Sequence, residues 1–178
     1  MRFPWRCILF GGLMTAYSLP AMAHIVFAEP TARSGSYYAG FFRVSHGCGA
    51  SDTASVRISV PETVVSARPQ PKPGWTLNIE RTPLATPIKG EGGAVIKDRV
   101  AAISWTGRLP ADQFEQFGVM MKLPDLTGPL YFPVEQKCVK GQNRWVHIPA
   151  PGQAWHSIPY PAPVIELTEP ADMQGMHH

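Results

Sequence analysis

His24 is the residue whose chemistry depends most on its place in the chain. Ala21-Met22-Ala23 puts small side chains at both recognition positions of an A-x-A cleavage site. Cleavage after Ala23 would give His24 a free α-amine, and this amine and the ring Nδ1 can close a six-membered chelate. Two nitrogens at one corner, completed by oxygen ligands, suit the tetragonal preference of Cu(II). Signal peptidase also tolerates a histidine after the cut, so an incidental His24 stays open.

The residues before His24 have the three parts of a secretory signal peptide. Arg2 and Arg6 form a basic start, and an apolar run follows over residues 7–17. This run is shorter than the roughly 20 apolar residues that span a bilayer, and a lipoprotein anchor would need a cysteine at the position of His24. We therefore expect residues 1–23 to be removed. The mature protein would then lie in an oxidising compartment such as a bacterial periplasm, without a membrane anchor.

The composition of the expected mature chain excludes several classes of partner. Cleavage would leave 155 of the 178 residues, the size of one domain, with a net charge near +1. This balance argues against a nucleic-acid partner or a polybasic membrane surface. Two cysteines would remain, Cys48 and Cys138. In an oxidising compartment they predict a structural disulfide that closes a loop of about 90 residues. The alternative is a pair of free thiolates that act as soft metal ligands.

The elements that must position these residues are short strands. Alternating apolar runs such as Val56, Ile58 and Val60 recur between the 19 prolines and 16 glycines, which is typical of an antiparallel sandwich. Residues 67–74 (ARPQPKPG) predict a polyproline-like crossover between sheets. We predict one all-β sandwich of about eight to nine strands over residues 24–169.

Beyond this domain the sequence offers little chemistry. The chain has no hydrolase elbow, phosphate loop, dinucleotide fingerprint or HExxH helix. Residues 170–178 lack apolar periodicity, and we expect a disordered tail. The tail is a candidate auxiliary copper site because it carries Met173, Met176, His177 and His178.

Several motifs of the mature chain resemble the YcnI-like periplasmic copper-binding family. The resemblance begins with an N-terminal histidine that opens a strand and continues through most of the domain, with PQPKPGW as its most specific piece. The matching segments are residues 24–27, 35–38, 42–48, 60–62, 69–77, 105, 107, 109–110, 114–118, 131–134, 138, 141 and 145. The resemblance implies a cupredoxin-like, immunoglobulin-like β-sandwich that holds one Cu(II) in a mono-histidine brace.

In such a brace one histidine supplies both the amine and the imidazole, a carboxylate completes the site, and a tryptophan lies close by. His24 matches the histidine, and Trp145 is expected to be the tryptophan. Relatives often carry an acidic residue directly after the first cysteine, whereas this chain has Gly49. Asp52 is the nearest replacement, with a simple turn residue as the alternative. Glu29 is a poor candidate, because an offset of five residues along a strand points it to the opposite face.

The remaining histidines decide between function classes. His46 is a candidate second-shell group or alternative ligand, and His147 and His156 rank lower. The sequence favours a copper carrier or metallochaperone that is not an enzyme, with the copper ion and other periplasmic or membrane copper-handling proteins as expected partners. A copper oxygenase with a two-histidine brace is the first alternative, in which His46 or His147 must reach the copper. A metal-free β-sandwich interaction module is the second.

Overall fold

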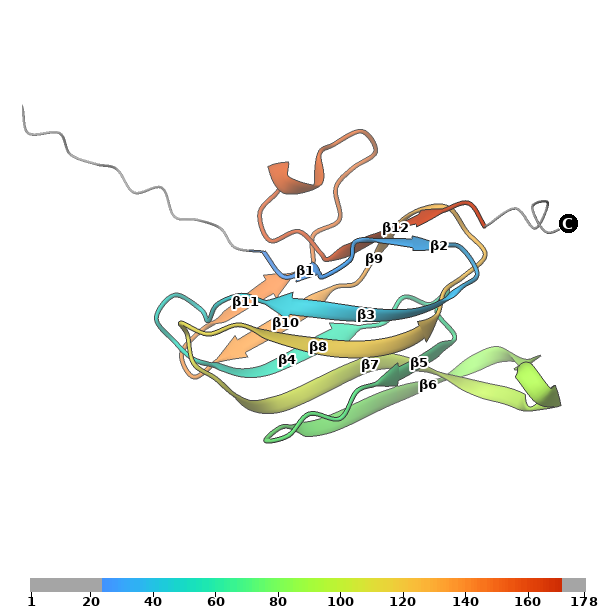
Figure 1. Cartoon of the computed structure of the whole chain (residues 1–178), viewed down its shortest axis with the longest axis horizontal. Helices are drawn as coiled ribbons and strands as arrows, with labels where there is room; N and C mark the ends of the chain where they lie inside the picture. The colour runs from blue at the N-terminus through green and yellow to red at the C-terminus, as the bar shows by residue number, and fades with distance from the viewer. Residues whose placement is uncertain (1–23, 171–178) are drawn as a thin grey trace, which may run out of the picture.

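The structure is a computed structural model that describes residues 24–170, so the expected signal peptide and residues 171–178 of the expected tail lie outside the described residues. Within residues 24–170 the chain forms strands and two single-turn 3-10 helices and has no α-helix, which confirms the all-β prediction (Figure 1). The elements are β1 Val26–Phe27, β2 Thr31–Arg33, β3 Tyr37–Val44, β4 Thr53–Ser59, β5 Ser66–Pro69, β6 Thr76–Lys89, η1 Glu91–Gly93, β7 Val95–Leu109, β8 Glu115–Lys122, β9 Gly128–Tyr131, β10 Val134–Cys138, β11 Gln142–Trp145, η2 Trp155–Ser157 and β12 Val164–Thr168.

Two sheets enclose the core. One has the strand order β1-β3-β8-β5 and the other β11-β10-β4-β7-β6, and a third, smaller sheet has the order β2-β12-β9. Alternate residues of the central strands point inward, as the period of two requires. Phe42 of β3, Ile58 of β4, Trp105 of β7 and Phe117 of β8 are completely buried in one hydrophobic cluster. The two main sheets therefore pack face to face around this cluster as a β-sandwich.

The structure has more strands than the predicted eight or nine, because several short segments that were expected to be loops pair at sheet edges. Ser66–Pro69, which overlaps the segment 67–74 expected to be a polyproline crossover, pairs with β8 as β5. Pro69 is tolerated there because β5 is the last strand of its sheet and needs no N–H for a further ladder. β2 is likewise an edge strand, because it pairs with β12 and with no other strand of the described sheets.

The N-terminus of the described chain lies where two sheet edges and a long loop meet. β1 is the edge strand of one main sheet and β11 the edge strand of the other. Residues 146–163 connect β11 to β12, and Figure 1 shows this segment, which we call the η2 loop, rising above β1. Ile25, next to His24, is only 2% exposed, so its burial holds His24 at this junction. No helix within residues 24–170 is long and apolar enough to cross a membrane.

Candidate metal centre

His24 lies against two indole rings. Its ring centroid is 5.7 Å from that of Trp145, with an interplanar angle of 60°, and 5.1 Å from that of Trp155, with an angle of 49°. Trp145 comes from the end of β11 and Trp155 from η2, so the sheet edge and the η2 loop both position His24. Burial, together with the nearby His156 and His46, lowers the pKa of the His24 imidazole. The ring is therefore neutral at neutral pH, as a metal ligand must be.

Trp145 is fixed by a buried polar residue that the sequence reasoning missed. Gln136 of β10 is fully buried, and its Oε1 accepts hydrogen bonds from Trp145 Nε1 and Asn143 Nδ2, both at 3.3 Å. Its Nε2 donates to the His46 carbonyl at 2.7 Å and to Thr53 Oγ1 at 2.8 Å. The signal was present in the sequence, because Gln136 alternates with the apolar Val134 on the inward face of one strand.

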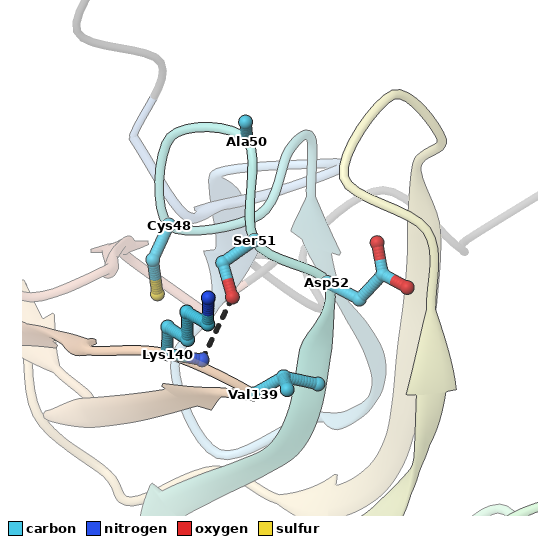
Figure 2. Close-up of a pocket in the computed structure, with 6 residues that line it drawn as sticks. All are labelled: Cys48, Ala50, Ser51, Asp52, Val139 and Lys140. Atoms are coloured by element: carbon cyan, nitrogen blue, oxygen red, sulfur yellow. Dashed lines mark hydrogen bonds between the residues drawn. The ribbon is translucent and has the colours of Figure 1, made fainter.

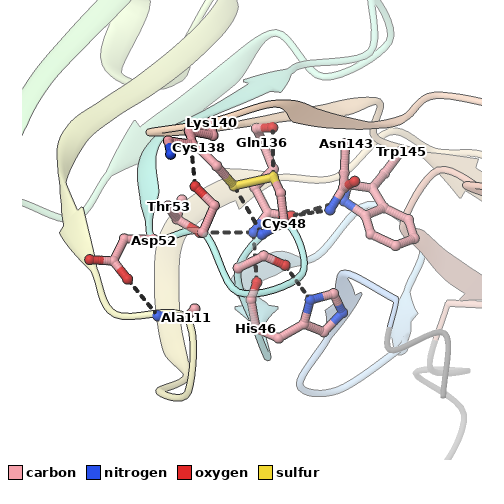
Figure 3. The surroundings of a disulfide bond; sticks show 12 residues. His46, Cys48, Asp52, Thr53, Ala111, Gln136, Cys138, Lys140, Asn143 and Trp145 are labelled. Carbon is pink, nitrogen blue, oxygen red and sulfur yellow. Dashed lines mark hydrogen bonds between the residues drawn. A yellow bond between two sulfur atoms is a disulfide. The ribbon is translucent and has the colours of Figure 1, made fainter. Parts of the chain in front are cut away.

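His46 lies on the same side as this network, as Figure 3 shows. Its Nδ1 is hydrogen-bonded to the carbonyl of Gly47 at 2.5 Å, and its own carbonyl is held by Gln136. Two residues further on, Cys48 forms a disulfide with Cys138, with a Cα–Cα distance of 6.0 Å and a separation of 90 residues. The predicted bridge is therefore confirmed, and it ties the loop that carries His46 to the end of β10.

Asp52 lies on the other side of the bridge from His46 and Trp145 (Figure 3). Its Oδ2 accepts a hydrogen bond from Arg108 Nε at 2.8 Å and its Oδ1 one from the Ala111 N–H at 3.0 Å. The hydrogen bond from Arg108, reinforced by that from Ala111, lowers the pKa of this carboxyl. Both oxygens thus have partners within the protein, and Asp52 is not among the side chains recorded around His24. Its role as a copper ligand stays a prediction.

Asp52 also lines an open pocket of about 530 Å³ that Figure 2 shows in close-up. The other lining residues are Cys48, Ala50, Ser51, Val139 and Lys140. Ser51 Oγ accepts a hydrogen bond from the Lys140 N–H at 2.8 Å, which closes one wall. The lining contains no imidazole, so this pocket does not join the histidines around His24.

The η2 loop brings two side chains to His24 that the sequence reasoning undervalued. Trp155 contacts the His24 ring, and Trp155 Nε1 donates to the Ala162 carbonyl at 2.7 Å. His156, the next residue, is exposed and close enough to influence the protonation of His24. His147 is exposed, and its Nδ1 is hydrogen-bonded to the Pro159 carbonyl. Contacts across a loop leave no periodic signal in the sequence, so Trp155 was not considered and His156 was ranked low.

The chemistry that this arrangement offers depends on the N-terminus. Within residues 24–170 no three side chains of His, Cys, Asp or Glu lie close enough to hold a metal ion by themselves. In the 178-residue chain the His24 nitrogen is a peptide amide, which has no basic lone pair. Cleavage before His24 would convert it into an amine and add a nitrogen donor to a neutral imidazole already flanked by indoles.

Comparisons with known proteins agree with this architecture. The crystal structure of an uncharacterized protein from Nocardia farcinica, described as an immunoglobulin-like fold, matches with a TM-score of 0.59 and 27% identity over 81% of this chain and 97% of that chain. The seventh ScaB type I cohesin of Pseudobacteroides cellulosolvens matches with a TM-score of 0.39 and 13% identity, over 87% of this chain and 97% of that one. The second likeness is too weak to carry an argument.

The family assignment rests on a domain model. No curated protein matches the chain. The model described as Domain of unknown function (DUF1775) matches residues 24–167. Because this match spans well over half of the chain and begins at the histidine that opens the motif pattern, the chain belongs to the YcnI-like DUF1775 family.

Proposed function

We propose that the mature protein begins at His24 and binds one Cu(II) ion in the periplasm as a copper carrier without catalytic turnover. The observation that carries this proposal is the setting of the His24 ring, which packs against Trp145 and Trp155 at the meeting point of two sheet edges. Copper binding there needs no rearrangement of the core. The amine and Nδ1 of one residue form the chelate, and both belong to a segment that Ile25 anchors.

Charge and solvation support the same function. The pKa of His24 is lowered by burial and by its histidine neighbours, so the ring keeps its lone pair at neutral pH without a metal. The indole of Trp145 is 2% exposed and is held by Gln136, which gives the ligand ring a rigid wall. A wall of this kind restricts ring rotation and lowers the entropy lost on coordination.

The decisive experiment compares two N-termini. Protein that has been exported and processed, with His24 verified as its first residue by mass spectrometry, should bind Cu(II) tightly in a competition assay. A version with one extra alanine before His24 should bind at least about 100-fold more weakly, a loss of about 2.7 kcal/mol, because its nitrogen is an amide. Equal affinity of the two proteins would exclude the brace.

Two controls separate this site from other donors. His147→Ala removes an exposed imidazole whose Nδ1 is held by Pro159, and it should leave the affinity unchanged. Truncation after Pro170 removes the Met/His tail and should leave the difference between the two N-termini intact. A difference that disappears with the tail would assign the copper to the tail.

A copper oxygenase remains a second candidate, because His46 and His156 both influence the His24 imidazole and a two-histidine brace needs a second ring. Copper-loaded protein supplied with a reductant should then consume oxygen in proportion to its copper content. We expect no consumption above that of the His24→Ala variant. Sustained turnover that requires His24 would make the protein an enzyme.

A further inference from the structure

The η2 loop has an unusual position for a surface loop. It runs over residues 146–163 between β11 and β12, and Figure 1 shows it standing away from the sheets while its helical turn lies above β1. None of the three residues of η2 is buried, so this turn adds nothing to the hydrophobic core. Exposed loops held by a rigid scaffold often carry functional side chains.

The base of the η2 loop is closed by hydrogen bonds, whereas its tip is exposed. His147 N–H donates to the Tyr160 carbonyl at 3.2 Å, and Ala162 N–H donates back to the His147 carbonyl at 2.8 Å. The tip, from Ala150 to Ala154, is exposed and includes Gly152 with a φ of +80°. Within the tip, Gln153 N–H donates to the Ala150 carbonyl at 2.9 Å and Ala150 N–H to Gln153 Oε1 at 3.2 Å. The outer part of the loop is thus a compact exposed turn that can move as a unit on its base.

Tyr160, whose carbonyl takes part in this closure, has a strained backbone conformation. It is the one described non-glycine residue with a positive φ, at +48°, a conformation that costs energy for a side chain with a Cβ. Its ring packs 5.2 Å from that of Trp145. The strained residue therefore connects the base of the loop to the same indole that lines His24.

The donors that His24 itself can offer do not complete a Cu(II) site. The brace supplies two nitrogens, whereas Cu(II) prefers four donors in a tetragonal arrangement. The one carboxylate that the sequence nominated, Asp52, is bonded to Arg108 and Ala111. Trp155 of η2 lies 5.1 Å from the His24 ring, centroid to centroid, and His156 is the next residue of the same turn. His156 and His46 are the two imidazoles that act electrostatically on His24.

Of these two imidazoles, His156 is the better placed to move to a metal. His46 Nδ1 is hydrogen-bonded to the Gly47 carbonyl, and the His46 backbone is held by Gln136. His156 is exposed, and among residues 24–170 no hydrogen bond to its ring is recorded. It follows Trp155, whose ring already contacts His24, so a small movement of η2 would bring His156 toward the chelate.

We propose that the η2 loop is a clasp: when the His24 brace binds Cu(II), η2 moves toward the metal and His156 supplies a second imidazole. This inference rests on the copper-binding function proposed above. The described side chains do not form a ready three-residue site, so closure must accompany binding.

The experiment counts imidazoles at the metal. Processed protein with His24 first, loaded with one equivalent of Cu(II), is measured by pulsed EPR, in which the remote nitrogen of each bound imidazole gives its own modulation. The parent should show two imidazoles and His156→Ala one, with an affinity at least about tenfold weaker. His147→Ala, in the same loop, should match the parent in both measurements.

Hydrogen exchange tests the clasp independently. Amides of residues 150–158 should exchange more slowly in the copper-loaded parent than in the metal-free parent, and His156→Ala should lose this protection. The His156→Gln variant, which keeps a polar side chain of similar size, should behave like His156→Ala. Circular dichroism spectra identical to the parent's are expected for both, because His156 packs against nothing in the core.

The outcomes separate this inference from the proposed function. A parent that binds copper through His24 with a single imidazole, unaffected by His156→Ala, would overturn the clasp and leave the carrier intact. Loss of the second imidazole in His46→Ala instead would overturn it as well, in favour of His46. A parent that shows no dependence on His24 would remove both proposals together.

Discussion

The two sides of the Cys48–Cys138 bridge are built from one short segment but have different partners. On one side His46 and Trp145 share Gln136, and Trp145 lies against His24. On the other side Asp52 is bonded to Arg108 and Ala111 and borders the open pocket of Figure 2. On the first side the His24 ring packs against Trp145, whereas the second side pairs the charge of Asp52 with Arg108.

A tight chain reversal produces this difference. Cys48 N–H donates to the Ser51 carbonyl at 3.0 Å and Ser51 N–H to the Cys48 carbonyl at 3.3 Å. Gly49 within this turn has a φ of +63°, which glycine adopts at little cost. The chain therefore turns back between His46 and Asp52, and the bridge fixes the turn. Six residues of sequence separate two side chains that lie on opposite sides of the disulfide.

Removal of the bridge should have the largest effect, because the bridge holds both sides. In the double variant Cys48→Ala/Cys138→Ala the unfolded chain regains the freedom of a loop of 90 residues, and the free energy of unfolding should fall by about 4 kcal/mol. Urea denaturation measures this loss. Copper binding below the melting transition should persist, since neither cysteine is a ligand. A folded variant that no longer binds copper would show that the bridge positions His24 directly.

A change at Gln136 should disturb one side selectively. Gln136→Leu keeps the volume but leaves the His46 carbonyl and the Trp145 N–H without their partner, and each buried orphan costs about 1–3 kcal/mol. We expect a loss of about 3 kcal/mol and weaker Cu(II) binding, because Trp145 and His46 lose their anchor. Gln142→Leu, an exposed glutamine on the neighbouring strand, is the matched control and should change neither quantity. Unchanged copper affinity in Gln136→Leu would show that the network serves stability alone.

The sequence predicted the features that depend on periodicity and on export. The alternation of apolar residues led to the sandwich, and two cysteines in an expected oxidising compartment led to the disulfide. The sequence reasoning placed Trp145 near the site through family resemblance, and the structure brings it against His24. These features follow from local patterns or from motifs shared with relatives.

The features that were missed depend on contacts between distant segments. Trp155 and His156 reach His24 from more than 130 residues away in sequence, along a loop without secondary-structure periodicity. The nomination of Asp52 assumed that a residue near Cys48 in sequence would lie on the side of His46. The chain reverses at Cys48–Ser51, and the Asp52 carboxylate is bonded to Arg108 and Ala111. Its role as a ligand stays a prediction, and these bonds would have to break for copper to bind it.

The smallest expected effect concerns Asp52, and it tests most directly whether the two sides of the Cys48–Cys138 bridge have different roles. The pKa of Asp52 is lowered from 3.8 by the hydrogen bonds from Arg108 and Ala111, so the ionised carboxylate stabilises the fold above about pH 4. This contribution is lost as the pH falls through the lower pKa of the folded state. Asp52→Asn should therefore reduce the melting temperature slightly at pH 7 and match the parent well below pH 4.

The matched control is Asp98→Asn on the β6–β7 hairpin. This change removes the exposed ion pair with Arg81, and Asp98, unlike Asp52, accepts no hydrogen bond from a backbone N–H of the described residues. It should cost less stability than Asp52→Asn, because Asp52 also anchors Ala111. Because both Asp52 oxygens are already bonded to Arg108 and Ala111, we expect the same copper affinity in both variants and in the parent. A tenfold loss of Cu(II) affinity in Asp52→Asn alone would instead make Asp52 a ligand, and the carboxylate would then have to leave Arg108 when copper binds.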